Sequence, residues 1–154
     1  MRKRVGGNAQ LVLAGNAGFG DVQYAEALHK GISEKWIIRT GFVDQADLPV
    51  LYGASKGVCY LSAYEGFGLP PLEALHCGAP VLVSDIQVLR EVLGDAALYS
   101  NPDDLDDVGR QMEKMLNGDA HGDISRLPKP YSWRQAASET LALLKRVVEH
   151  AHRG

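Results

Sequence analysis

The sequence predicts an α/β fold in which a Rossmann-like parallel sheet carries helices on both faces. Short apolar runs alternate with longer segments of helical period, which is the pattern of stacked βα units. The runs are short and continuously apolar, as expected of strands that are buried on both faces. A chain of 154 residues has the size of one domain. The five predicted strands cover residues 10–14, 36–40, 57–61, 80–84 and 96–99.

The first two helices are expected after the first and the second strand. A loop at residues 15–20 leads into a helix for which Asp21 is a candidate N-cap. The next helix is expected over residues 45–54 with Asp44 as its N-cap. Asp47 then stands at N3, the position of the acidic residue in a capping box.

Two further helices are marked by their ends. Pro70 and Pro71 are tolerated only near a helix start, where a missing N–H has no partner to lose. We therefore expect a helix that begins close to them and ends at Gly78. An apolar stripe over residues 105–116 predicts another helix, which stops at the Asn-Gly pair that follows.

The end of the sequence predicts a long amphipathic helix. Ser132 and Gln135 form a capping box, and apolar residues then recur on one face as far as Val148. We therefore divide the chain into an α/β domain over residues 1–130 and a terminal helix with its tail over residues 131–154.

Composition argues against several classes of protein. A net charge of -3 leaves no broad basic field, so nucleic acid is not an expected partner. Cys59 and Cys77 lack metal-binding spacing, which favours reduced thiols and predicts no metal site. The apolar runs are far shorter than the ~20 residues that span a bilayer, and no signal peptide is visible. We expect a cytoplasmic protein.

The segment between the third strand and the next helix has the features of an anion-binding loop. Gly66 and Gly68 lack a Cβ, so the backbone there can approach a ligand and adopt left-handed angles. The N–H groups of residues 67–69 can then point at a diphosphate near the helix start. Glu65 and Glu73 bracket this loop and offer carboxylates to sugar and ribose hydroxyls.

A purely structural interpretation of the same residues stays open on the pattern alone. Glycine-rich loops between a strand and a helix are common, and short motifs carry a risk of false matches. A glutamate in a first helical turn, such as Glu73, is favoured by the helix dipole without any ligand. The order of the residues decides between the two interpretations.

Residues 64–75 closely resemble the signature of glycosyltransferase family 4, and the Glu-x7-Glu pattern from Glu65 to Glu73 is complete. The following Cys-Gly-Ala-Pro-Val at residues 77–81 also matches the family pattern. The resemblance continues in register from about Leu11 to Val148 and so covers nearly the whole chain. It implies the C-terminal, nucleotide-sugar-binding domain of a GT-B enzyme.

The resemblance also implies roles for single residues. Glu65 contacts the transferred sugar and is the catalytic candidate, whereas Glu73 binds the ribose. Backbone groups around Val43 face the base, and the loop at Gly15 borders the same cleft. Val43 also suits a hydrophobic staple and Gly15 a turn, so a structural role stays open for both. The phosphate or sugar is held between the two glutamates by Gly66, Phe67, Gly68 and Leu69.

The activity implied by the resemblance is that of a retaining hexosyltransferase. Such an enzyme moves a hexose, with mannose as one candidate, from a nucleotide-diphosphate sugar to an acceptor hydroxyl without a cofactor or a required metal. The acceptor, a glycan or a lipid, is bound by an N-terminal domain that this chain lacks. Peripheral membrane association of the full enzyme and assembly into a homo-oligomer are further expectations.

The chain departs from the family pattern at its start. The family's domain opens with a central strand and a loop carrying an arginine and a lysine, and neither has a counterpart here. We therefore expect a sheet without its first strand and an isolated chain that is inactive. The alternative is a catalytically silent nucleotide-sugar-binding module or the remnant of a truncated gene. A sugar-nucleotide epimerase shares the architecture but is not expected to carry the Glu-x7-Glu loop.

Overall fold

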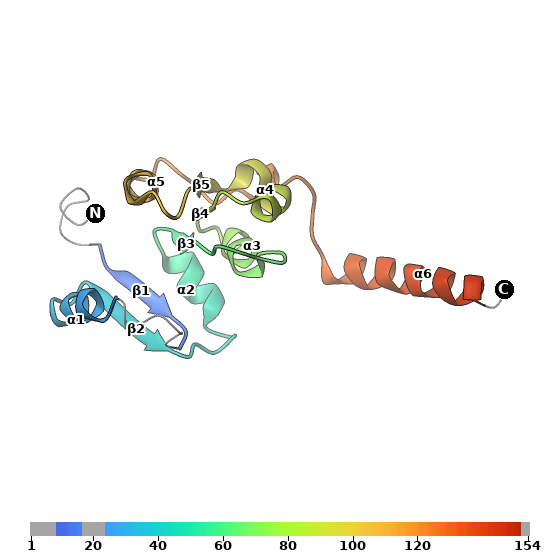
Figure 1. The fold of residues 1–154 in the computed structure, drawn as a ribbon, viewed down its shortest axis with the longest axis horizontal. Helices are drawn as coiled ribbons and strands as arrows, with labels where there is room; N and C mark the ends of the chain where they lie inside the picture. The colour runs from blue at the N-terminus through green and yellow to red at the C-terminus, as the bar shows by residue number, and fades with distance from the viewer. Residues whose placement is uncertain (1–8, 17–23, 152–154) are drawn as a thin grey trace.

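The computed structural model describes residues 9–16 and 24–151, and it shows five short strands followed by a long terminal helix (Figure 1). The strands are β1 (Leu11–Ala14), β2 (Ile37–Gly41), β3 (Val58–Tyr60), β4 (Val81–Ser84) and β5 (Leu98–Ser100). The helices are α1 (Ala25–Ser33), α2 (Leu48–Ala54), α3 (Leu69–His76), α4 (Gln87–Leu93), α5 (Leu105–Asn117) and α6 (Trp133–Ala151). Two 3₁₀ turns are η2 (Gly94–Ala96) and η3 (Ile124–Arg126).

The described strands form two parallel sheets. One has the order β1-β2 and the other the order β3-β4-β5. All five predicted strands are present, and the α/β prediction is confirmed. Within the described residues no ladder joins the two sheets.

The core is built on both faces of β4, all four residues of which are buried. Val81 and Val83 point to one face and pack with α3 and α4. Leu82 points to the opposite face and packs against Val108 and Met115 of α5. Because side chains alternate along a strand, the continuously apolar run of β4 requires a helix layer on each side. The predicted arrangement of helices on both faces is therefore confirmed.

Helix α2 begins later than predicted. It starts at Leu48 rather than at residue 45, and Asp47 occupies the N-cap position without a side-chain cap bond. Asp44 lies in the preceding turn, where its Oδ1 accepts from the Ala46 N–H at 3.4 Å. Pro49 explains the difference, because a proline is tolerated only in the first turn of a helix.

The predicted ends of two helices are confirmed. Helix α3 begins just before Pro70 and Pro71, and it is followed by Gly78 with a left-handed φ of 81°. Helix α5 ends at Asn117, and its C-cap Gly118 has the same φ of 81°. A residue with a Cβ would be strained at that angle. These stops fix where the chain turns back into β4 and where it leaves α5.

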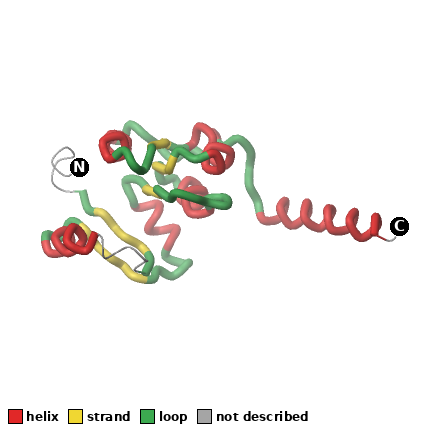
Figure 2. The backbone as a smooth tube through the Cα atoms, in the orientation of Figure 1, coloured by secondary structure: helices red, strands yellow, loops and turns green. Residues whose placement is uncertain are grey.

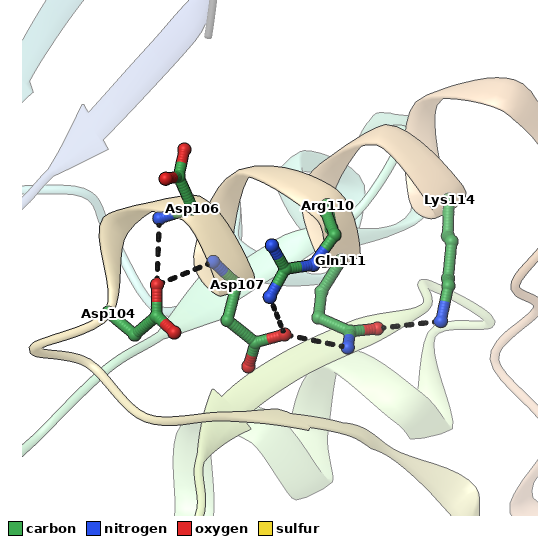
Figure 3. A network of polar contacts seen from close by, with 6 residues as sticks. All are labelled: Asp104, Asp106, Asp107, Arg110, Gln111 and Lys114. Atoms are coloured by element: carbon green, nitrogen blue, oxygen red, sulfur yellow. Dashed lines mark hydrogen bonds and ion pairs between the residues drawn. The ribbon is translucent and has the colours of Figure 1, made fainter.

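A polar network caps α5 and lies along its outer face (Figure 3). Asp104 is the N-cap, and its Oδ1 accepts from the N–H groups of Asp106 at 3.0 Å and Asp107 at 2.9 Å. Lys114 in turn donates to Gln111 at 3.2 Å. The contacts of Asp104 satisfy two backbone donors at the helix start and so stabilise the first turn of α5.

Three details of the chain differ from the sequence prediction or go beyond it. Strand β5 begins two residues later than expected, because Gly94–Ala96 forms a 3₁₀ turn. Helix α4 was not predicted at all. The candidate cap Asp21 lies outside the described residues, and α1 begins at Ala25.

Helix α6 extends away from the rest of the chain (Figure 2). Ser132 accepts from the Gln135 N–H at 3.1 Å, which is one half of the predicted capping box. The other half is missing, because the Gln135 side chain donates to Glu139 at 2.8 Å instead. Every residue of α6 is exposed, including its apolar stripe at Leu141, Leu144 and Val148.

Candidate functional site

Gly68 forms the turn that starts α3. It is buried and has a left-handed φ of 89°. A Cβ at this position would lie 2.5 Å from Cδ2 of Leu89, a core residue of α4. Glycine is therefore required here by the backbone angle and by packing. A substitution at Gly68 would therefore disturb the fold as well as any ligand contact of the loop.

Gly66 differs from Gly68 in every one of these respects. It is exposed, its φ lies outside the left-handed region, and a Cβ built on it would meet nothing within 4 Å. The expectation of a left-handed angle is wrong for Gly66. Its bare backbone faces open space, so an external group can approach it without displacing protein atoms.

The backbone donors of this loop are few and unused. Pro70 and Pro71 carry no N–H, so the first turn of α3 offers fewer donors than an ordinary helix start. The amides of Phe67, Gly68 and Leu69 remain, and none of them donates to an acceptor in the part of the chain that the structure describes. These three amides are available to an anion.

The side chain of Phe67 anchors the loop to a distant segment. Its ring meets the ring of Tyr131 edge to face, with centroids 5.2 Å apart. Lys129 Nζ lies 5.3 Å from the centroid of the same Tyr131 ring. The ring contact links the loop to Tyr131, while the amide of Phe67 has no acceptor among the described residues.

Glu65 is held by a tyrosine at the end of β3. The hydroxyl of Tyr60 donates to Glu65 Oε1 at 2.6 Å. Burial, and then the bond to Glu65, raise the pKa of Tyr60 to about 12. The phenol therefore stays protonated at neutral pH and fixes one oxygen of the carboxylate, which leaves Oε2 for a ligand.

A shallow pocket of about 300 Å³ lies beside Glu65. One wall is the loop after β3, and the other is the start of α4. The pocket combines polar groups with aliphatic surface and the exposed ring of Tyr64. Its lining residues are Ala63, Tyr64, Glu65, Ile86, Gln87, Val88 and Glu91.

Glu73 lies on a different side of the loop. It is exposed on α3 and is absent from the lining of the pocket. Burial, followed by the charge of Glu73, raises the pKa of Tyr52 on α2. Of the two glutamates of the motif, only Glu65 lines the pocket, so a ligand that meets both must extend beyond it.

Gly15 and Val43 follow the first two strands. Gly15 has a φ of 111°, and its N–H donates to the carbonyl oxygen of Gly41 at 2.8 Å. Val43 is half-buried in the segment after β2. Both lie beyond the carboxyl ends of parallel strands, as Glu65 does, which is where open α/β sheets bind ligands. Neither residue belongs to the lining of the pocket beside Glu65.

The basic residue that lies nearest along the chain to the pocket is already paired. Arg90 Nη2 donates to Asp85 Oδ2 at 2.7 Å, and its guanidinium lies 4.3 Å from the centroid of the Tyr99 ring. The hydrogen bond from Arg90 lowers the pKa of Asp85 below its ordinary value. The lining of the pocket itself contains two carboxylates and no basic side chain.

The family model described as "Glycosyl transferases group 1" matches residues 1–139. The match includes the loop with both glutamates and every residue of the pocket. The chain belongs to this family. As a group 1 glycosyltransferase chain it has the α/β, Rossmann-like architecture of the GT-B enzymes, as the resemblance implied.

The similar proteins of this glycosyltransferase chain include several mannosyltransferases. It is 37% identical over 140 residues to the O-antigen chain mannosyltransferase B of Escherichia coli, which covers 88% of this chain and 37% of the relative. It is 52% identical over 58 residues to the O-antigen chain mannosyltransferase RfbU of Salmonella typhimurium, covering 38% of this chain and 16% of the relative. The chain thus spans less than two fifths of the length of these relatives.

Solved structures show the same fold in this glycosyltransferase chain. Sucrose-phosphate synthase from Thermosynechococcus elongatus matches with a TM-score of 0.67 and 21% identity, over 92% of this chain and 39% of the other. The outer core galactosyltransferase WaaB matches with a TM-score of 0.55 and 23% identity, over 72% and 32%. At these identities the likeness concerns the fold.

Within residues 9–16 and 24–151 no three His, Cys, Asp or Glu side chains are grouped so that they could hold a metal ion. No helix in the same ranges is long and apolar enough to cross a membrane.

Proposed function

We propose that this chain binds the nucleotide-diphosphate sugar of a retaining hexosyltransferase and contributes its catalytic carboxylate, Glu65. The observation that carries the proposal is the placement of Glu65, which Tyr60 holds at the wall of a pocket beyond the carboxyl ends of β3 and β4. The free amides of the neighbouring loop supply donors for the diphosphate. Because several relatives are mannosyltransferases, mannose is the sugar that we propose first.

In the proposed reaction the bond between the sugar C1 and the diphosphate oxygen breaks, and the diphosphate takes the electron pair. The acceptor oxygen forms a bond to C1 from the same face, and the acceptor proton ends on the diphosphate. Glu65 accepts a hydrogen bond from a sugar hydroxyl and fixes the ring, while the amides of Phe67, Gly68 and Leu69 receive the growing negative charge. Glu73 binds the ribose on the α2 side. No cofactor or metal is part of the proposal.

Gly66 provides the test of this proposal. We expect the unmodified chain to bind GDP-mannose in a calorimetric titration, and Gly66→Ala to weaken the binding of both GDP-mannose and GDP several-fold. The new methyl group meets no protein atom but lies where the diphosphate approaches. Gly109→Ala on α5 is the matched control, because its Cβ also meets nothing within 4 Å. A panel with UDP-glucose and UDP-galactose identifies the donor.

The result also separates the proposal from its rivals. Unchanged affinity in Gly66→Ala would exclude the loop as the phosphate site. Binding without turnover, even in the presence of the remaining enzyme, would indicate a silent nucleotide-sugar-binding module instead of half of a transferase.

A further inference from the structure

The wall of the pocket opposite Glu65 comes from a helix that has no assigned role. Gln87 is the first residue of α4, and Glu91 lies four positions later. Residues four apart stand on the same helix face, so both side chains project into the same pocket. The loop with Tyr64 and Glu65 forms the other wall.

The position of this wall is fixed by the core. Leu89, Val92 and Leu93, on the other face of α4, are buried and pack in the main cluster. Leu89 also lies against the position where a Cβ on Gly68 would stand, so α4 and the glycine loop are packed together. The core thus connects the two walls of the pocket.

The polar groups on α4 have no other partner. The side chains of Gln87 and Glu91 are exposed and form no hydrogen bond or ion pair with the residues that the structure describes. Arg90, which lies between them in the sequence, is paired with Asp85 instead. The side-chain amide of Gln87 can donate and accept hydrogen bonds, and the carboxylate of Glu91 can accept them. Both groups can therefore bind a ligand.

The chemistry of the two walls suits a hexose ring. Its hydroxyl groups both donate and accept, as the combination of Gln87, Glu91 and Glu65 requires. The ring of Tyr64 is 88% exposed at the same pocket and offers an apolar face to the C–H groups of a sugar. A volume of about 300 Å³ is at the small end of ligand pockets, which suits one sugar ring rather than a whole nucleotide sugar.

We propose that Gln87 and Glu91 form the second wall of the hexose subsite and help to select the sugar that is transferred. This inference rests on the proposed function and extends it, because it assigns hydroxyl contacts to α4 in addition to Glu65. The nucleoside and diphosphate lie outside this pocket, on the other side of the glycine loop. Changes on α4 therefore affect the sugar-bearing donor and spare the free nucleoside diphosphate.

The experiment is a calorimetric titration of the full chain and its variants with GDP-mannose and with GDP. We expect Gln87→Ala and Glu91→Ala each to weaken GDP-mannose binding about ten-fold and to leave GDP binding within about two-fold. A ten-fold change is about 1.4 kcal/mol, which lies at the upper end for one neutral hydrogen bond and near the lower end for one to a charged group. Glu26→Ala removes an exposed carboxylate on α1 and should change neither affinity. Thermal unfolding of each variant checks that α4 stays folded.

The outcomes separate this inference from the proposed function. If Glu65→Ala weakens GDP-mannose binding but both α4 variants bind it like the unmodified chain, the second wall is refuted and the proposed function stands. Equal losses for GDP-mannose and GDP in the α4 variants would also refute it, since the helix would then act on the whole site. If the unmodified chain binds neither GDP-mannose nor any other nucleotide sugar of the panel, both proposals fail.

Discussion

The hydroxyl of Tyr60 and the carboxylate of Glu65 are joined by a hydrogen bond of 2.6 Å, across the turn that leads out of β3. The bond ties a loop residue to the last residue of a strand in the core sheet. Rigid support of this kind is what a carboxylate needs in order to meet a sugar hydroxyl in a fixed geometry. Tyr60 is thus a positioning residue for Glu65.

The first prediction concerns this support. Tyr60→Phe removes only the donor oxygen, so Glu65 becomes free to rotate, and we expect affinity for GDP-mannose to fall several-fold, in line with the net value of one hydrogen bond of about 0.5–1.5 kcal/mol. Affinity for GDP should not change, because GDP lacks the hexose that meets Glu65. A parallel loss of GDP affinity in the titration would instead indicate that Tyr60 shapes the whole loop.

The second prediction concerns the titration of Tyr60. Its pKa is raised from 10.0 to about 12, so the folded protein holds the proton more tightly than the unfolded chain. The stabilisation is complete below pH 10 and is lost as the pH rises from 10 towards 12. We expect tyrosinate absorbance of the folded protein to show a late component near pH 12, and Tyr60→Phe to reduce it. A late component of unchanged size in that variant would contradict the assignment.

The third prediction tests the contact between the glycine loop and α4. Gly68→Ala should destabilise the protein, because alanine is strained at a φ of 89° and its Cβ would collide with Leu89. Leu89→Ala should lower the free energy of unfolding by about 2–5 kcal/mol through the cavity that it leaves. In the double variant the collision is relieved. Its loss of stability should therefore be smaller than the sum of the two single losses by about 0.5 kcal/mol or more. Strict additivity in denaturant unfolding would show that the two residues do not touch.

The strands could be predicted from the sequence because each is an isolated apolar run. β4 is the clearest case, since its four residues are buried on both faces. Pro70 and Gly78 fixed the ends of α3 for a similar reason, because each residue type restricts the backbone locally. Features that are set by a single residue or a short run could thus be predicted from the sequence.

Features that depend on tertiary contacts were not accessible from the sequence. Helix α4 has only seven residues and no side-chain cap, so its short apolar face gave no periodic signal. Its place beside Gly68 and Glu65 arises from packing against the loop, and no sequence pattern indicates it. The bond from Tyr60 to Glu65 depends in the same way on how the loop turns, although a tyrosine at a strand end before a glutamate is a signal to look for.

The fourth prediction is that this chain alone does not transfer sugar at a useful rate. No basic side chain lines the pocket that we assign to the sugar, and Arg90, the basic residue nearest to it along the chain, is engaged by Asp85. Positioning of the acceptor can lower a barrier by ~7–11 kcal/mol, and the chain spans only 37% of the length of the O-antigen chain mannosyltransferase B that it matches. Release of GDP from GDP-mannose in the presence of mannose oligomers measures this, with the full-length O-antigen chain mannosyltransferase B as the positive control. Rapid transfer by the chain alone would refute the prediction.

The division of labour between Glu65 and Glu73 is the central claim, and one titration tests it most directly. Glu65→Ala and Glu73→Ala are each titrated with GDP-mannose and with GDP. Only Glu65 lines the pocket, so we expect Glu65→Ala to weaken only GDP-mannose, and Glu73→Ala to weaken both ligands because both contain the ribose. Each loss should be about 1.5–3 kcal/mol, the value of a hydrogen bond to a charged group. Equal losses of both ligands in both variants would contradict the assignment of the sugar to Glu65.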